Sequence, residues 1–168
     1  MTVAGVLLTG GASRRLGRDK ARLPVAMRLA AVLQEALDGP VVEVGAGTTG
    51  LPCIDDVGRE GPLAALAMVP AADTVVLACD LPFVSVDLVR RRAARAATAV
   101  PVVGGRAQPL CARYSAAALA AVPALVAAGE RRMTALLDAV EVEWLSDFAP
   151  AGEFADVDTP DDLARLGL

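Results

Sequence analysis

The sequence predicts a single-domain α/β protein with a three-layer α/β/α arrangement and a mostly parallel sheet. Strand-like and helix-like segments alternate along the chain, an order typical of parallel strands covered by helices on both faces. The 168 residues are 55% apolar but only 3% aromatic, which suits a compact core built from small side chains. Because no repeat, linker or low-complexity segment interrupts residues 1–168, we expect one domain.

Apolar runs and turn residues predict the elements of the first half of the chain. Continuous apolar runs are typical of strands buried in a parallel sheet. Apolar residues at helical spacing precede Gly39-Pro40, which ends a helix, and Pro62 suits a first helical turn. The expected elements are a strand over 3–8, a helix over 26–37, strands over 41–44 and 53–54, a helix over 61–69 and a strand over 74–79.

The second half continues the alternation. Ser85 is expected to cap a helix whose arginines form a solvated face. Pro123 is expected to break or kink a helix that Gly129 ends, and Thr159-Pro160 suits the start of a last helix. The expected elements are the helix with Arg90, Arg91, Arg92 and Arg95, strands over 100–103 and 109–114, helices over 116–128 and 133–140, a strand over 142–145 and a helix after Thr159.

Composition excludes several classes of function. The net charge of −4 provides no basic surface to hold nucleic acid by electrostatics. No apolar run reaches membrane-spanning length, and the N-terminal residues lack the features of a signal peptide, so we expect a cytoplasmic protein. Cys53, Cys79 and Cys111 are widely spaced, and we expect three buried, reduced side chains.

The absence of some residue types narrows the chemistry. The chain contains no histidine and no asparagine, which excludes histidine-based catalytic triads and imidazole metal sites. Carboxylates, arginines, hydroxyls and one lysine remain. This set suits a hard cation such as Mg²⁺ acting together with phosphate groups.

A glycine-rich loop follows the first expected strand. It runs from Leu8 to Lys20, the only lysine of the chain. Its glycines allow close approach of the backbone to a ligand, and its cations suit a polyphosphate. The loop matches neither the Walker A motif nor the dinucleotide fingerprint. The alternative is a tight turn with a solvated charged face. The residues concerned are Gly10, Gly11, Gly17, Arg14, Arg15, Arg18 and Lys20.

Asp80 directly follows the apolar run over 74–79. Ligands of open α/β sheets bind at the carboxyl ends of the strands, where the glycine-rich loop also begins. A carboxylate there is suited to hold Mg²⁺ on nucleotide phosphates. The alternative makes Asp80 an ordinary turn residue before Pro82.

From these residues onward the chain resembles the molybdenum cofactor guanylyltransferases, members of a nucleotidyltransferase superfamily with a Rossmann-like fold. The first loop matches their signature, and the resemblance continues in order through nearly the whole chain. The matching segments are Leu8 to Ala21, Gly61-Pro62-Leu63-Ala64, Cys79-Asp80-Leu81-Pro82-Phe83, Gln108-Pro109-Leu110, Gly129-Glu130-Arg131-Arg132 and Asp156 to Leu163.

The resemblance implies a reaction in which the terminal phosphate of molybdenum-carrying molybdopterin attacks the α-phosphorus of GTP. Pyrophosphate leaves, and positioning and charge neutralisation supply most of the rate. By this match the backbone of Leu8, Thr9, Gly10 and Gly11 holds the nucleotide, Arg15 and Lys20 neutralise the β- and γ-phosphates, and Asp80 holds Mg²⁺, with Mn²⁺ as the alternative ion.

Further contacts follow from the same resemblance. Asp55 or Asp56, just before Gly61, falls where the family has an aspartate near guanine and ribose, and an ordinary surface turn is the alternative.

Gln108 and either Arg131 or Arg132 correspond to contacts with the pterin, and solvation of both arginines is the alternative. The family often has asparagine where this chain has Gly45.

Other functions remain open from sequence alone. The nearest is a sister nucleotidyltransferase that uses CTP or another acceptor. A nucleotide-binding homologue without turnover is the other, favoured by the short segment between Lys20 and the next helix. Proteins that insert molybdenum or mature molybdoenzymes are the further partners implied by the resemblance.

Overall fold

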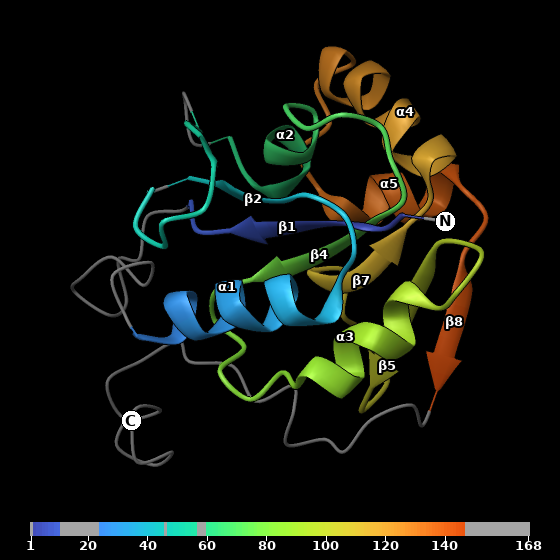
Figure 1. The fold of residues 1–168 in the computed structure, drawn as a ribbon. Helices are drawn as coiled ribbons and strands as arrows, with labels where there is room; N and C mark the ends of the chain where they lie inside the picture. Colours follow the sequence, from blue (N-terminus) through green and yellow to red (C-terminus); the bar gives the residue numbers. More distant parts are fainter. Residues whose placement is uncertain (1, 11–23, 46, 57–59, 147–168) are drawn as a thin grey trace.

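The computed structural model describes residues 2–10, 24–45, 47–56 and 60–146, whose strands form one eight-stranded sheet (Figure 1). The strands are β1 (Ala4–Leu8), β2 (Val41–Val44), β3 (Cys53–Ile54), β4 (Thr74–Ala78), β5 (Ala99–Val103), β6 (Arg106–Ala107), β7 (Cys111–Tyr114) and β8 (Glu143–Ser146).

The sheet is mostly parallel, as predicted. Its order is β3-β2-β1-β4-β7-β5-β6, and β8 pairs with β5. Strands β3, β2, β1 and β4 pair in parallel, while β7 pairs antiparallel with both β4 and β5. The neighbouring strands β1 and β4 are buried over almost their whole length, because both of their faces are covered.

Helices cover the two faces of this sheet and complete a three-layer arrangement (Figure 1). Successive side chains of a strand point to opposite faces, so Leu7 joins one core and Val6 and Leu8 join the other. One face is covered by α1 (Pro24–Ala36) and α3 (Val86–Ala93), and the other by α2 (Pro62–Leu66), α4 (Ala116–Ala127) and α5 (Met133–Ala139).

The predicted helix ends follow from their capping residues. The Ser85 hydroxyl accepts a 3.1 Å hydrogen bond from the Leu88 N–H at the start of α3. Gly129 ends α4 with φ 90°, and its N–H donates to the Val126 carbonyl at 3.0 Å. The expected break at Pro123 is wrong, because α4 continues through that residue. The buried Leu119 and Val122 before Pro123 and the partly buried Leu125 and Val126 after it pack against the same core.

Two exposure predictions are also wrong. Arg92 does not belong to a solvated face, since its exposed fraction is 1%. It follows the buried Leu88 by one helical turn, so helical phase places it against the sheet. Cys53 is exposed rather than buried, unlike Cys79 and Cys111, because it lies on the two-residue edge strand β3.

The strand expected over 109–114 begins only at Cys111, and β6 was not predicted. The Gln108 N–H donates to the Pro101 carbonyl, and the Cys111 N–H donates to the Gln108 carbonyl, which folds this segment into a turn. Proline supplies no N–H for a sheet ladder, and the prediction overlooked that constraint at Pro109. None of the helices in the described part of the chain is long and apolar enough to cross a membrane.

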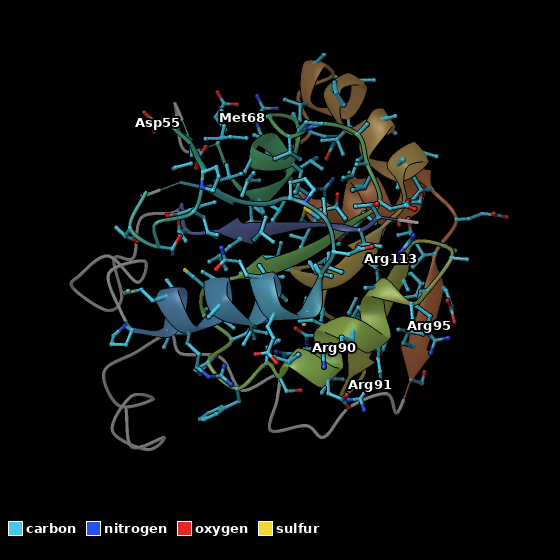
Figure 2. The ribbon with its side chains drawn as sticks, in the orientation of Figure 1. Asp55, Met68, Arg90, Arg91, Arg95 and Arg113 are labelled. Atoms are coloured by element: carbon cyan, nitrogen blue, oxygen red, sulfur yellow. The ribbon has the colours of Figure 1, made fainter. Side chains whose placement is uncertain are left out.

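A buried ion pair ties the sheet together at the edge where β4 begins. Arg113 Nη2 lies 2.9 Å from Asp73 Oδ2, and Arg113 Nη1 donates to the Ala97 carbonyl at 2.8 Å. Asp73 Oδ1 in turn accepts from the Ala116 N–H at 3.0 Å. Arg113 is fully buried and comes from β7, so the pair joins the parallel and antiparallel parts of the sheet (Figure 2).

We predict that Arg113→Met lowers the free energy of unfolding by about 3–5 kcal/mol, because the Asp73 carboxylate loses its buried partner. Urea unfolding at neutral pH measures the change. The control is Arg90→Met, since Arg90 lies on the surface and its pair with Glu35 is long, at 3.9 Å. Its cost should stay below about 1 kcal/mol. Equal losses in the two variants would contradict a stabilising role for the buried pair.

Candidate functional site

The carboxyl ends of three neighbouring strands meet at one edge of the sheet. Leu8 of β1 pairs with Val44 of β2 on one side and Ala78 of β4 on the other. Beyond the ladder, the Thr9 N–H donates to the Val44 carbonyl at 2.9 Å, and the Cys79 N–H donates to the Leu8 carbonyl at 3.2 Å. The strands after which the candidate residues follow are therefore held side by side, and the arrowhead of β1 in Figure 1 points to this edge.

Backbone approaches backbone closely at this edge. A Cβ atom on Gly45, which has φ 135°, would lie 2.1 Å from the Gly10 nitrogen. A Cβ atom on Gly10 would lie 2.5 Å from Asp56 Oδ2. A side chain at Gly45 would collide with the Gly10 backbone, so packing requires glycine there, whereas a side chain at Gly10 would have to displace the Asp56 carboxylate. Gly10 is exposed, whereas Leu8 and Thr9 turn buried side chains inward.

The two adjacent aspartates after β3 have different surroundings. Asp56 is half-buried and its carboxylate lies against Gly10. Asp55 is exposed and points away from the strands, as Figure 2 shows. Sequence reasoning left the choice between them open, and the structure brings only Asp56 against the backbone of the first loop.

Asp80 lies on the opposite side of β1 from Asp56. It is half-buried and follows Cys79, whose N–H is bonded to Leu8. The loop after Asp80 is anchored to α1 by Arg28, whose Nη1 donates to the Pro82 carbonyl at 2.5 Å and to the Val84 carbonyl at 3.1 Å. This anchor was not predicted from the sequence.

The turn that contains Gln108 reaches the same edge. Because β7 runs antiparallel to β4, the residues that precede β7 lie where β4 ends. The Ala78 N–H donates to the Leu110 carbonyl at 2.8 Å, and the Tyr114 hydroxyl donates to the Pro109 carbonyl at 2.7 Å. Burial raises the pKa of Tyr114, which keeps this hydroxyl protonated as a donor. Gln108 therefore precedes by two residues Leu110, whose carbonyl accepts the hydrogen bond from the end of β4.

The segment containing Arg131 lies against the start of α2. A Cβ atom on Gly61, the N-cap residue, would lie 3.7 Å from the Arg131 carbonyl oxygen. Arg131 Nη2 forms a 2.6 Å ion pair with Glu60 Oε2. The Arg132 side chain is 76% exposed, and its one ion pair within the described residues is with Glu130, at 3.5 Å. Both arginines are exposed, so their interpretation as solvated residues stays open, and Arg131 is in addition paired with Glu60.

Glu43 is the residue at this edge that sequence reasoning missed. It is fully buried in β2, and its carboxylate accepts hydrogen bonds from Thr9, Thr48 and Thr49. Burial raises the pKa of Glu43, but the bonds from Thr49, Thr9 and Thr48 outweigh burial and lower it below its ordinary value. The signal was present in the sequence, where one acidic residue interrupts the apolar run over 41–44.

Several predicted residues lie outside the described residues, so the structure does not test them. They are Gly11, Arg14, Arg15, Gly17, Arg18 and Lys20 of the first loop and the closing segment from Asp156 to Leu163, with the helix expected after Thr159. In the ranges that the structure does describe, no group of three or more His, Cys, Asp or Glu side chains could hold a metal ion by itself. What the edge does offer is exposed glycine backbone, two separated carboxylates, an amide and a paired arginine. These groups can bind a polar, phosphate-bearing ligand.

Comparison with known proteins agrees with this chemistry. Residues 5–144 match the family described as MobA-like NTP transferase domain. A molybdenum cofactor guanylyltransferase of Rhodobacter capsulatus is 37% identical over 98% of this chain and 95% of that protein. The resemblance stated from the motifs is therefore confirmed.

Solved structures show the same fold. The Archaeoglobus fulgidus molybdopterin-guanine dinucleotide biosynthesis protein A superposes with a TM-score of 0.77 at 20% identity, covering 96% of this chain and 95% of that one. A Mycobacterium tuberculosis protein, crystallised in complex with manganese, has a TM-score of 0.56 at 21% identity and covers 99% and 98% of the two chains. The protein is a nucleotidyltransferase and belongs to the MobA-like NTP transferase family.

Proposed function

We propose that this protein transfers GMP from GTP to molybdenum-carrying molybdopterin, forming a guanine dinucleotide cofactor and releasing pyrophosphate. The relatives named molybdenum cofactor guanylyltransferase support this reaction. The observation that carries it is the arrangement of Asp56 and Asp80 on either side of the β1 end, with the exposed backbone of Gly10 between them. Such an edge can hold the base and the phosphates of one nucleotide at the same time.

The base side of the site is assigned to Asp56 and Gly10. Guanine presents two adjacent donors, its ring N1–H and its exocyclic amine, and an ionised carboxylate can accept from both. Asp56 is the better candidate than Asp55 because it lies against Gly10, where the nucleotide would meet the backbone. A cytosine or adenine base lacks this pair of donors, which supplies a physical reason for GTP.

Asp80 is assigned to a divalent metal ion. Mg²⁺ in phosphate-transferring sites is commonly bound by one or two carboxylates together with substrate phosphate oxygens, and a half-buried carboxylate at a strand end fits that pattern. Manganese in the Mycobacterium tuberculosis neighbour supports a divalent ion in this fold. When bound, the ion would neutralise charge on the phosphates.

The leaving group and the acceptor need cations and positioning. Arg15 and Lys20 are assigned to the β- and γ-phosphates, where their charge favours departure of pyrophosphate. Gln108 and Arg131 are assigned to the acceptor, and Arg131 would exchange its Glu60 partner for a phosphate.

The attacking phosphate of the acceptor is already ionised near neutral pH, so no general base is required. Proteins that supply molybdenum-loaded molybdopterin or receive the product are the further partners we propose.

Asp80→Asn is expected to lower kcat for pyrophosphate release by about 10²–10³-fold, since a clamp on developing phosphate charge is lost. The assay contains GTP, Mg²⁺ and molybdenum-loaded molybdopterin, and circular dichroism checks that the variant is folded. Asp87→Asn is the control, because Asp87 is an exposed aspartate on α3 paired only with Arg91 among the described residues. A folded Asp80→Asn variant with the wild-type rate would refute the assignment.

Asp56→Asn is expected to raise KM for GTP by about 10–100-fold, because a charge-assisted acceptor is replaced by a neutral amide. Asp55→Asn should change it little, since Asp55 is exposed and points away. The measurement compares kcat/KM for GTP, CTP and ATP in the wild type and both variants. A wild type that prefers CTP would replace the proposed reaction with a cytidylyl transfer, and equal effects at Asp55 and Asp56 would refute the choice of Asp56.

A further inference from the structure

Glu43 holds a saturated set of hydrogen bonds inside the protein. Oε1 accepts from the Thr9 hydroxyl at 2.5 Å and from the Thr48 N–H at 3.1 Å. Oε2 accepts from the Thr49 N–H at 3.0 Å and from the Thr49 hydroxyl at 2.5 Å. Each carboxylate oxygen offers about two acceptor positions, so these four donors fill the group. Glu43 is therefore not available as a direct ligand of any substrate.

The four donors come from two separate segments of the candidate site. Thr9 directly follows β1 and precedes Gly10, while Thr48 and Thr49 belong to the turn that follows Gly45. That turn is held further by the Leu51 N–H, which donates to the Thr49 hydroxyl at 3.4 Å. One buried carboxylate thus links the end of β1 to the turn after β2.

Stability alone does not explain an ionised group at this position. The neighbours of Glu43 along β2 are valines, and burying a charge carries a desolvation cost that an apolar residue of similar size avoids. A carboxylate differs from an apolar residue in that it requires donors in a defined geometry. The hydrogen bonds orient Thr9 inward and leave the Gly10 backbone as the exposed part of the loop.

The linked segments lie on the base side of the site. Gly45 packs against the Gly10 backbone, and Gly10 packs against Asp56, whereas Asp80 follows β4 on the other side of β1. A shift of the turn or of Thr9 would move Gly10 relative to Asp56. It would alter the surface that meets a nucleoside more than the groups that act on the phosphates.

We propose that Glu43 is a positioning residue for the nucleoside part of the nucleotide, acting through Thr9 and the Thr48–Thr49 turn. This inference rests on the proposed function in that it takes a nucleoside triphosphate as the ligand. The affinity for the nucleotide then depends on Glu43, a side chain that does not touch the nucleotide. The role differs from that of Asp80, whose loss should act on turnover.

The test compares Glu43→Gln with the wild type in calorimetric titrations of GTP, CTP, ATP and UTP in the presence of Mg²⁺. The amide places an NH₂ group, a donor, where Glu43 has an acceptor oxygen facing the donors of Thr9, Thr48 and Thr49. The displaced segments should raise the Kd of the tightest-bound nucleotide about tenfold or more. In steady-state assays KM should rise by a similar factor, while kcat stays close to the wild-type value. The destabilised variant Arg113→Met is the control, and its folded fraction should bind the nucleotide as the wild type does.

A second pair of variants covers the case in which Glu43→Gln does not fold. Thr49→Val removes one donor and should weaken binding, whereas Thr49→Ser retains the hydroxyl and should restore it. An unchanged Kd in folded Glu43→Gln, or equal Kd values for the two Thr49 variants, would overturn the inference. A wild type that binds CTP most tightly would overturn the proposed GTP reaction but not this inference, which is then decided on CTP. Absence of binding to all four nucleotides would overturn both.

Discussion

The parallel pairing of β1 between β2 and β4 is the constraint on which the candidate site depends. Because Leu8 pairs with both Val44 and Ala78, the residues that follow these strands emerge side by side. A one-residue slip of β1 would turn Leu8 out of its core and carry Thr9 away from Glu43. The register is held by apolar packing on both faces, so the same burial that stabilises the sheet aligns the polar groups at its edge.

The two edges of the sheet use buried charge differently. At the edge where β4 begins, Arg113 and Asp73 neutralise each other and join the antiparallel strands to the parallel ones. At the carboxyl edge, Glu43 is satisfied by neutral hydroxyl and N–H donors, among the residues that the structure describes. The ion pair between Arg113 and Asp73 serves to hold neighbouring strands together. A carboxylate held by neutral donors keeps loops in place without adding a positive charge.

Membership of a nucleotidyltransferase family explains why this chain needs no histidine. Phosphoryl and nucleotidyl transfer depend on positioning and charge neutralisation more than on proton transfer. Carboxylates, arginines, one lysine and glycine backbone are sufficient for such chemistry, and they are the groups that this composition retains. The exposed backbone of Gly10 meets the complementary requirement, which is backbone that a ligand can approach.

Local patterns in the sequence determined most elements of the fold and the identity of most candidate residues. Apolar runs located β1, β2, β3 and β4, while Ser85 and Gly129 marked helix ends, because such signals act within a few residues. Only the tertiary structure decided which aspartate lies against Gly10, that Arg92 is buried, and that β7 enters the sheet antiparallel between β4 and β5. It also decided that the Glu43 carboxylate meets Thr9. The bond between those two side chains spans 34 positions in sequence, and contacts of that range depend on strand register and packing, which no local pattern records.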